Sequence, residues 1–211
     1  MKPATPKQIT IDLLRHGEPE GGDVLRGRVD HCLTELGWQQ MRNAITHVAG
    51  RDQKNLWTHV VTSPLQRCSA FARFIAQDLG LALREEASWQ EIDYGDWDGM
   101  PLLIWREQAA PMFREFRQDM SRLVPPNGED FISFKDRVLQ AWQNLSALPD
   151  GSHVLLVTHG GVLRVILPTV LGMPLNRSQP LHIPFASFSR IRLTADSDRT
   201  DASLVFHHTL A

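Results

Sequence analysis

The sequence predicts an α/β protein whose central sheet is mostly parallel and carries helices on both faces. Three observations support this fold class. Short β-branched and apolar runs alternate along the chain with longer segments of helical spacing. Several of the apolar runs end in a loop that leads directly into a helical segment, as in the units that build parallel sheets. The 211 residues contain no repeat, low-complexity tract or linker, so we expect one domain over residues 1–211.

The first expected strand covers residues 9–14, which are β-branched or apolar and lead straight into Arg15-His16-Gly17. A helix is expected to run from Thr34, whose hydroxyl suits an N-cap, to about residue 49. Helical spacing places four apolar side chains on the inner face of this helix: Leu36, Met41, Ile45 and Val48. The first conspicuous polar residues therefore lie at the carboxyl end of a buried strand.

A second strand is expected at residues 57–62, with a second helix directly after it. Ser63 suits the N-cap of this helix, and Pro64 suits its first position, where no backbone N–H is needed. Gly80 is the expected residue at which this helix ends. A short strand at residues 82–85 is expected to follow.

The middle of the chain predicts a loop and an insertion. Residues 91–101 are rich in Gly, Asp and Trp without a clear period, which is typical of an ordered functional loop. Residues 102–122 have helical spacing with many charges. Residues 125–128 interrupt this helical pattern before a helix at about 130–147. We therefore expect residues 92–128 to form a small helical lid over the core.

The last third of the chain completes the expected sheet. Residues 153–158 give the clearest strand pattern, and His159-Gly160-Gly161 leads from it into a helix that ends near Gly172. Two further β-like runs lie at about 185–193 and 202–208.

The composition is that of an ordinary soluble globular protein, with 42% hydrophobic and 22% charged residues. A net charge of −2 gives no general attraction to nucleic acid or to an anionic membrane. No apolar run approaches the ~18 residues of a membrane span, and the two cysteines, Cys32 and Cys68, do not suggest a disulfide framework. We therefore expect a cytoplasmic protein. We expect no metal or other cofactor, because H-x-x-x-H and paired-cysteine motifs are lacking.

Basic side chains gather at one expected edge of the sheet. Arg15 and His16 follow the first strand, Arg67 lies in the first turn of the helix after the second strand, and His159 follows the late strand. Ligands of open α/β sheets bind outside the carboxyl ends of the strands, so these side chains are expected to converge. Together with the free N–H groups of the helix that begins at Gly160, they suit a phosphoryl dianion.

Cleavage of a phosphomonoester also needs a nucleophile and an acid. Neutral His16 can attack phosphorus, and Gly17 allows the backbone to approach the phosphate closely. Glu91 is the candidate acid, because the charge of a bound phosphate helps a nearby carboxyl group to keep its proton. After giving this proton to the leaving oxygen, Glu91 can take another from water.

The run Leu14-Arg15-His16-Gly17-Glu18 resembles the signature of the histidine phosphatase superfamily, also called phosphoglycerate mutase-like. The resemblance covers about residues 9–170 and includes further motifs in the order typical of that family: Gly27, Asp30, Leu33-Thr34, Gly37, Ser63-Pro64-Leu65, Arg67, Glu91, Gly95-Asp96-Trp97 and His159-Gly160-Gly161. It implies that His16 becomes phosphohistidine and that Glu91 is the proton donor. It also implies that the phosphate pocket is lined by Arg15, Arg67 and His159.

Within the superfamily, residues 91–99 and 126–129 most resemble the α-ribazole phosphatases, which act in the assembly of the cobalamin lower ligand. This resemblance favours α-ribazole 5′-phosphate as the substrate. The family often has Thr and Asn where this chain has Pro19 and Gly22, which alters the substrate contacts expected of this loop.

Three other functions stay open on the sequence. A broad-specificity phosphatase or a phosphoglycerate mutase would use the same phosphohistidine. The short lid favours hydrolysis over the mutase reaction, because it gives water access to the phosphohistidine. A non-catalytic phosphate-binding module would have the same fold, although such a module needs no proton donor such as Glu91. The expected partner is a small phosphomonoester, with no nucleic acid and no membrane, and a homodimer stays open.

Overall fold

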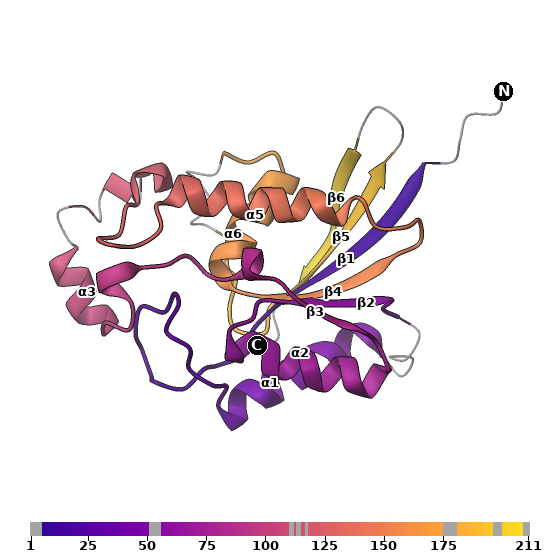
Figure 1. Ribbon diagram of the computed structural model, residues 1–211, viewed down its shortest axis with the longest axis horizontal. Coiled ribbons are helices and arrows are strands. Elements are labelled where there is room, and N and C mark those ends of the chain that lie inside the picture. The colour runs from indigo at the N-terminus through magenta and orange to yellow at the C-terminus, as the bar shows by residue number, and fades with distance from the viewer. Residues whose placement is uncertain are drawn as a thin grey trace.

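A computed structural model describes residues 6–50, 56–109, 112, 115, 116, 118–174, 181–195 and 200–208. They form a six-stranded sheet with helices on both faces (Figure 1). In spatial order the strands are β3 (Leu83–Glu85), β2 (His59–Thr62), β4 (His153–Thr158), β1 (Lys7–Arg15), β5 (Phe188–Ala195) and β6 (Thr200–His208). The described α-helices are α1 (Glu35–Ala49), α2 (Gln66–Leu79), α3 (Leu102–Gln108), α5 (Phe131–Leu145) and α6 (Gly160–Val170).

The strands bury apolar side chains on both faces of the sheet. Ile9, Ile11 and Leu13 of β1 belong to an apolar cluster that includes α5 and α6. Leu14, the next residue along β1, belongs to a second cluster with α1 and α2. Successive side chains of a strand point to opposite faces, so this division places one pair of helices on each face. In Figure 1, α5 lies above β2, β3 and β4 while α1 and α2 lie below them, which confirms the α/β prediction with helices on both faces.

The sheet is mixed, and the prediction of a mostly parallel sheet is wrong. β1, β2, β3 and β4 pair in parallel, but β5 pairs antiparallel with both β1 and β6. The residues directly before β5 lie at the carboxyl end of β1, where the N–H of Ala186 donates to the carbonyl of His16 over 3.1 Å. β5 therefore starts where β1 ends and runs back along it, and β6 pairs antiparallel with β5.

The start of α1 follows the prediction, with one exception on its inner face. The hydroxyl of Thr34 accepts a hydrogen bond from the N–H of Gly37 over 2.9 Å and caps the helix. Met41 and Ile45 are buried, whereas Leu36 is 54% exposed and its expected place on the inner face is wrong. None of the helices in the described part of the chain combines the length and the apolar character that a membrane span requires.

The start of α2 differs from the prediction. The helix begins at Gln66 with Leu65 at the N-cap, so Ser63 is not the cap. The carboxylate of Asp30 accepts the hydrogen bond of the Gln66 N–H over 2.6 Å, so an acceptor from another segment serves this end of the helix. The hydroxyl of Ser63 lies instead 2.7 Å from Nε2 of His159. At the other end, Gly80 has the left-handed conformation (φ 67°) and ends the helix as predicted.

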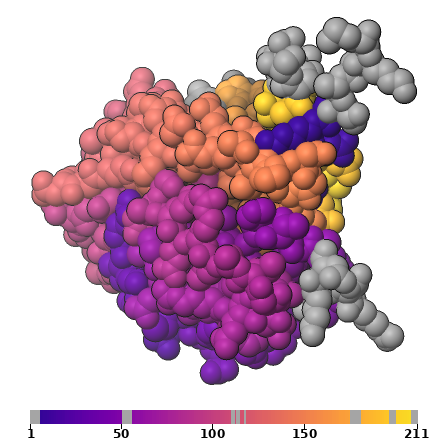
Figure 2. Space-filling model, turned by 45° about the vertical axis from the view of Figure 1, so that its right-hand side comes forward, coloured from indigo at the N-terminus to yellow at the C-terminus, as the bar shows by residue number. Residues whose placement is uncertain are grey.

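The described residues of the segment 92–128 pack onto the core. They form α3 and the short turns η3 (Gly95–Trp97) and η4 (Met120–Arg122). Trp97 and Trp105 are buried in the same apolar cluster as α5. In Figure 2 the salmon surface that contains α5 adjoins the magenta surface of the chain around residue 90. Motion of this segment as a lid stays a prediction.

Asp12 is a fully buried carboxylate in the middle of the sheet. Arg190 of β5 donates to it from Nε over 2.7 Å and from Nη2 over 2.8 Å, and Nε2 of His153 in β4 lies 2.9 Å away. The indole N–H of Trp57 also donates, over 2.8 Å. Burial acts to raise the pKa of Asp12, but the hydrogen bonds from Arg190 and His153 outweigh it, and the pKa is lowered. Asp12 therefore ties β1 to its neighbours on both sides.

Replacing Asp12 by Asn should lower the free energy of unfolding by about 2–4 kcal/mol, because Arg190 and His153 lose their charged acceptor inside the sheet. Asp78→Asn, at an exposed position of α2, is the matched control and should change stability by less than about 0.5 kcal/mol. Urea unfolding followed by circular dichroism measures both. Equal stability of the two variants would contradict the role given to Asp12.

Candidate active site

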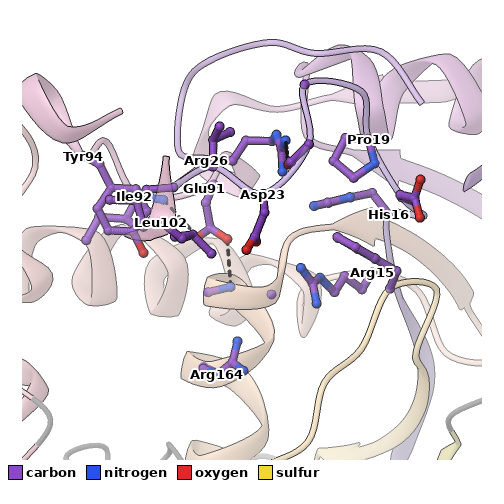
Figure 3. Close-up of a pocket in the computed structure, with 18 of the residues that line it drawn as sticks. Arg15, His16, Pro19, Asp23, Arg26, Glu91, Ile92, Tyr94, Leu102 and Arg164 are labelled. Carbon is purple, nitrogen blue, oxygen red and sulfur yellow. Dashed lines mark hydrogen bonds between the residues drawn. The ribbon is translucent and has the colours of Figure 1, made fainter. Parts of the chain in front are cut away.

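A cavity of about 940 Å³ opens at the carboxyl ends of β1 and β4. His16 and Arg15 lie on one side of it, and the apolar side chains of Ile92 and Leu102 lie on the other (Figure 3). Glu91 lies between the two sides. The cavity thus has a polar half, where the predicted residues gather, and an apolar half. The apolar half is lined by Ile92, Tyr94, Leu102, Met120, Leu123, Phe131 and Phe134.

His16 directly follows β1, and its side chain is only 4% exposed. Nδ1 lies 2.8 Å from the carbonyl oxygen of Gly17, which can only accept, so this nitrogen carries the ring proton of the neutral form. Burial, together with the charges of Arg15 and Arg67, holds the pKa of His16 well below its ordinary value. The imidazole is therefore neutral at physiological pH, with the lone pair on Nε2.

His159 is fully buried at the N-cap of α6 and lies behind His16. The centroids of the two imidazole rings are 5.3 Å apart, and the rings meet edge to face. Nε2 of His159 lies 2.7 Å from the hydroxyl of Ser63. Burial lowers the pKa of His159, and the charge of Arg67 lowers it further. His159 does not line the cavity, so it contacts the site through His16 and the start of α6.

Arg15 is held by the segment that precedes β5. Its Nη1 donates to the carbonyl of Ile183 over 2.6 Å, and its guanidinium carbon lies 4.4 Å from the ring centroid of Phe185. Burial and the nearby charge of Arg164 lower the pKa of Arg15 to about 10, which leaves it protonated at neutral pH. Nε of Arg15 is buried without a hydrogen-bond partner among the residues described.

Arg67 lies beneath the loop after β1 and is fully buried. Its Nη1 donates to the carbonyl of Val29 over 2.8 Å, and its Nη2 donates to the carbonyl of Gly27 over 2.6 Å. It does not line the cavity in this structure. Its charge still acts at the site, because it lowers the pKa of both His16 and His159.

Glu91 lines the cavity next to the start of α6, and its side chain is 8% exposed. Its Oε2 accepts a hydrogen bond from the N–H of Gly161 over 2.8 Å, and its Oε1 accepts one from the N–H of Ile92 over 3.0 Å (Figure 3). A Cβ at position 161 would lie 2.0 Å from Oε1, so only glycine allows this contact. Gly160 is also tightly packed, since its Cβ would lie 3.2 Å from Nε of Arg15.

Sequence reasoning missed two basic residues of the cavity. Arg164 lies one helical turn after Gly160, so the i, i+4 spacing could have placed it on the same face of α6. Arg26 also lines the cavity and is held by the carbonyls of Glu20 and Gly22, over 2.9 and 2.8 Å. Its polar contacts depend on the fold of this loop, which no periodic pattern predicts.

The sequence pattern of the histidine phosphatase superfamily (branch 1) matches residues 11–203, a range that includes His16, Arg15 and Glu91. This chain therefore belongs to the histidine phosphatase superfamily.

Relatives of known sequence or structure carry several different names. A bifunctional protein of Mycobacterium tuberculosis is 32% identical over 186 residues, which make up 87% of this chain and 50% of that protein. This chain thus spans about half the length of that relative. A probable phosphoglycerate mutase of Serratia proteamaculans is 31% identical over 191 residues, 87% of this chain and 84% of its own. An Escherichia coli structure, proposed to be an alpha-ribazole-5′-P phosphatase, has 25% identity, a TM-score of 0.80 and coverage of 95% and 96%.

Gly161→Ala should lower kcat/KM by about 10- to 100-fold, because the new methyl group displaces the Glu91 carboxylate from the start of α6. Thr169→Ala, near the other end of the same helix, should leave kcat/KM within about twofold of the wild type. Steady-state kinetics with benzyl phosphate, whose alkoxide leaving group needs a proton, measures both variants, and melting temperatures show whether they fold equally well. Wild-type activity of Gly161→Ala would show that the position of Glu91 does not matter.

The ring of His16 should remain neutral in mildly acidic solution. A lowered pKa means that protonation is completed only at lower pH, so the free base persists below the ordinary histidine value of about 6.5. Nitrogen-detected NMR of the imidazoles between pH 5 and 8, assigned by comparison with His16→Ala, measures this titration. A midpoint at or above 6.5 would contradict the effect of burial and of the two arginines.

Proposed function

We propose that this protein is a phosphomonoesterase that works through a phosphohistidine at His16. The observation that carries the proposal is the bond from Nδ1 of His16 to the Gly17 carbonyl, which directs the Nε2 lone pair away from the backbone. A neutral, oriented imidazole beside buried arginine is the arrangement that an attacking nitrogen needs. Phosphoglycerate mutases and phosphatases of the superfamily differ in the final acceptor of the phosphoryl group.

In the proposed first step, Nε2 of His16 attacks phosphorus and the bond to the ester oxygen breaks. Glu91 gives its proton to this oxygen, so the alcohol leaves uncharged. Arg15 and the N–H groups at the start of α6, including that of Gly160, stabilise the charge on the transferring phosphoryl group. In the second step, the Glu91 carboxylate takes a proton from water, whose oxygen attacks phosphorus; the bond between phosphorus and Nε2 breaks, which releases phosphate and restores the neutral imidazole. We assign His159 and Arg67 to the phosphate pocket as buried groups that support His16.

The proposed substrate is α-ribazole 5′-phosphate. The apolar half of the cavity supports an aromatic, weakly polar leaving group, because seven apolar or aromatic side chains line it. The similar Escherichia coli protein has been proposed to be a phosphatase for the same substrate. We further propose a single cytoplasmic domain that needs no metal, since Arg15 and the helix N-terminus supply the positive charge.

A phosphoglycerate mutase activity is the second candidate. Arg164 and Arg26 line the cavity in addition to Arg15, and they could hold the carboxylate of a phosphoglycerate. One relative carries the name of a probable phosphoglycerate mutase. The two candidates differ in what accepts the phosphoryl group, which makes them separable by product analysis.

We expect the wild type to release phosphate from α-ribazole 5′-phosphate faster than from a plain aryl phosphate or from 3-phosphoglycerate, in buffer without added metal. His16→Ala should lose at least about 10⁴-fold of this activity, and Glu91→Gln about 10²- to 10³-fold. Rapid quenching followed by intact-mass spectrometry should detect an acid-labile phosphoryl adduct that His16→Ala lacks. Formation of 2-phosphoglycerate without phosphate release would favour the mutase, and retained activity of His16→Ala would refute the phosphohistidine route.

A further inference from the structure

The segment that leads to Glu91 is held by a charged pair outside the cavity. Arg137 of α5 donates from Nε to Oε1 of Glu129 over 2.9 Å and from Nη2 to Oε2 over 2.7 Å. Both carboxylate oxygens are thus engaged by one planar guanidinium, a geometry that fixes the orientation of each partner. The two side chains are only 22% and 17% exposed, so the pair is largely shielded from water.

The third nitrogen of Arg137 contacts the backbone just before Glu91. Nη1 donates to the carbonyl oxygens of Ser88 over 2.8 Å and Gln90 over 3.1 Å, with that of Ala87 at 3.4 Å. These residues form the turn η2 (Ala87–Trp89) and the link from it to Glu91. One side chain therefore contacts three carbonyl groups of this short segment.

Glu129 contacts the backbone just after Glu91. Its N–H donates to the carbonyl of Asp93 over 2.9 Å, and its carboxylate lies 3.4 Å from the Asp93 N–H. Arg137 and Glu129 thus fix the chain two residues or fewer on each side of Glu91, while the carboxyl group of Glu91 reaches into the cavity. Neither residue of the pair lines the cavity itself; the contact with its wall is indirect, since the guanidinium carbon of Arg137 lies 5.2 Å from the ring centroid of Phe134, which lines the apolar half.

We propose that Glu129 and Arg137 are positioning residues for the proton donor Glu91. The proposal rests on the phosphatase function above, because only proton transfer to the leaving oxygen gives the position of Glu91 a kinetic effect. The pair sets where the Glu91 carboxyl lies along the cavity, and the Gly161 N–H then fixes its rotation. Arginine is required at position 137, since lysine has one nitrogen and cannot hold the carboxylate of Glu129 and the carbonyls together.

The dependence of the rate on the leaving group separates positioning from simple stabilisation. A 2,4-dinitrophenolate leaves without help from an acid, whereas benzyl alkoxide needs a proton. Both leaving groups are aromatic and suit the apolar half of the cavity. Arg137→Lys and Glu129→Gln should lower kcat/KM for benzyl phosphate by about tenfold or more, and for 2,4-dinitrophenyl phosphate by less than about threefold.

Glu91→Gln provides the reference pattern, with a loss of about 100-fold or more for benzyl phosphate only. Arg73→Lys disrupts a comparable arginine–glutamate pair on the surface, with Glu85, and should leave both substrates unaffected. Thermal unfolding of each variant shows whether it is folded, and Glu129→Gln provides the test if Arg137→Lys does not fold. An equal loss for both substrates, or no loss, would overturn the positioning role while leaving Glu91 as the donor. No selective loss in Glu91→Gln would instead overturn the proposed acid, and the positioning role with it.

Discussion

The candidate active site depends on two arginines, the partly buried Arg15 and the fully buried Arg67, held next to a neutral histidine. Arg15 and Arg67 both bring a guanidinium into the protein interior, and neither forms an ion pair with a carboxylate among the residues described. Burial of an unpaired charge is costly, so the fold must satisfy these groups in another way. Main-chain carbonyls of Ile183, Gly27 and Val29 do so in part. In the proposed function, a phosphoryl dianion supplies the negative charge that these carbonyls cannot.

The loop of residues 27–29 shows how this positive charge is held in place. Its three consecutive N–H groups donate to the carboxylate of Asp98 over 2.5 to 2.8 Å. Its carbonyls face the opposite way and accept from Arg67. Gly27 also passes close to the Glu91 segment, because a Cβ there would lie 2.3 Å from the carbonyl of Ile92. One short loop therefore connects the buried Arg67 with the segment that carries Glu91, and Asp98 is a residue that motif spacing alone did not single out.

The parts of the site that the sequence predicted are those that follow directly from strand ends. His16 and His159 could be placed together because β1 and β4 are apolar strands that run in parallel, and parallel strands end at one edge. The contacts of Arg15 could not be predicted, because Ile183 and Phe185 reach it through an irregular segment that has no period. The same segment leads into β5 from the carboxyl end of β1. β5 is therefore antiparallel to β1, and the sheet is mixed rather than mostly parallel as expected. The prediction of Ser63 as the N-cap of α2 was wrong for a related reason. The acceptor at the start of the helix is Asp30, which is distant in sequence, and the hydroxyl of Ser63 lies next to His159 instead.

Burial lowers the pKa of His16, and the neighbouring charges that lower it further are also suited to stabilise the phosphorylated form that we propose. Positive neighbours disfavour the imidazolium, because protonation would add a third cation to a buried cluster. Transfer of a phosphoryl group to the same nitrogen brings negative oxygens with it, and these are attracted to the guanidinium of Arg15. In the proposed mechanism, burial and the two arginines thus disfavour a proton on Nε2, while the arginines favour a phosphoryl group there.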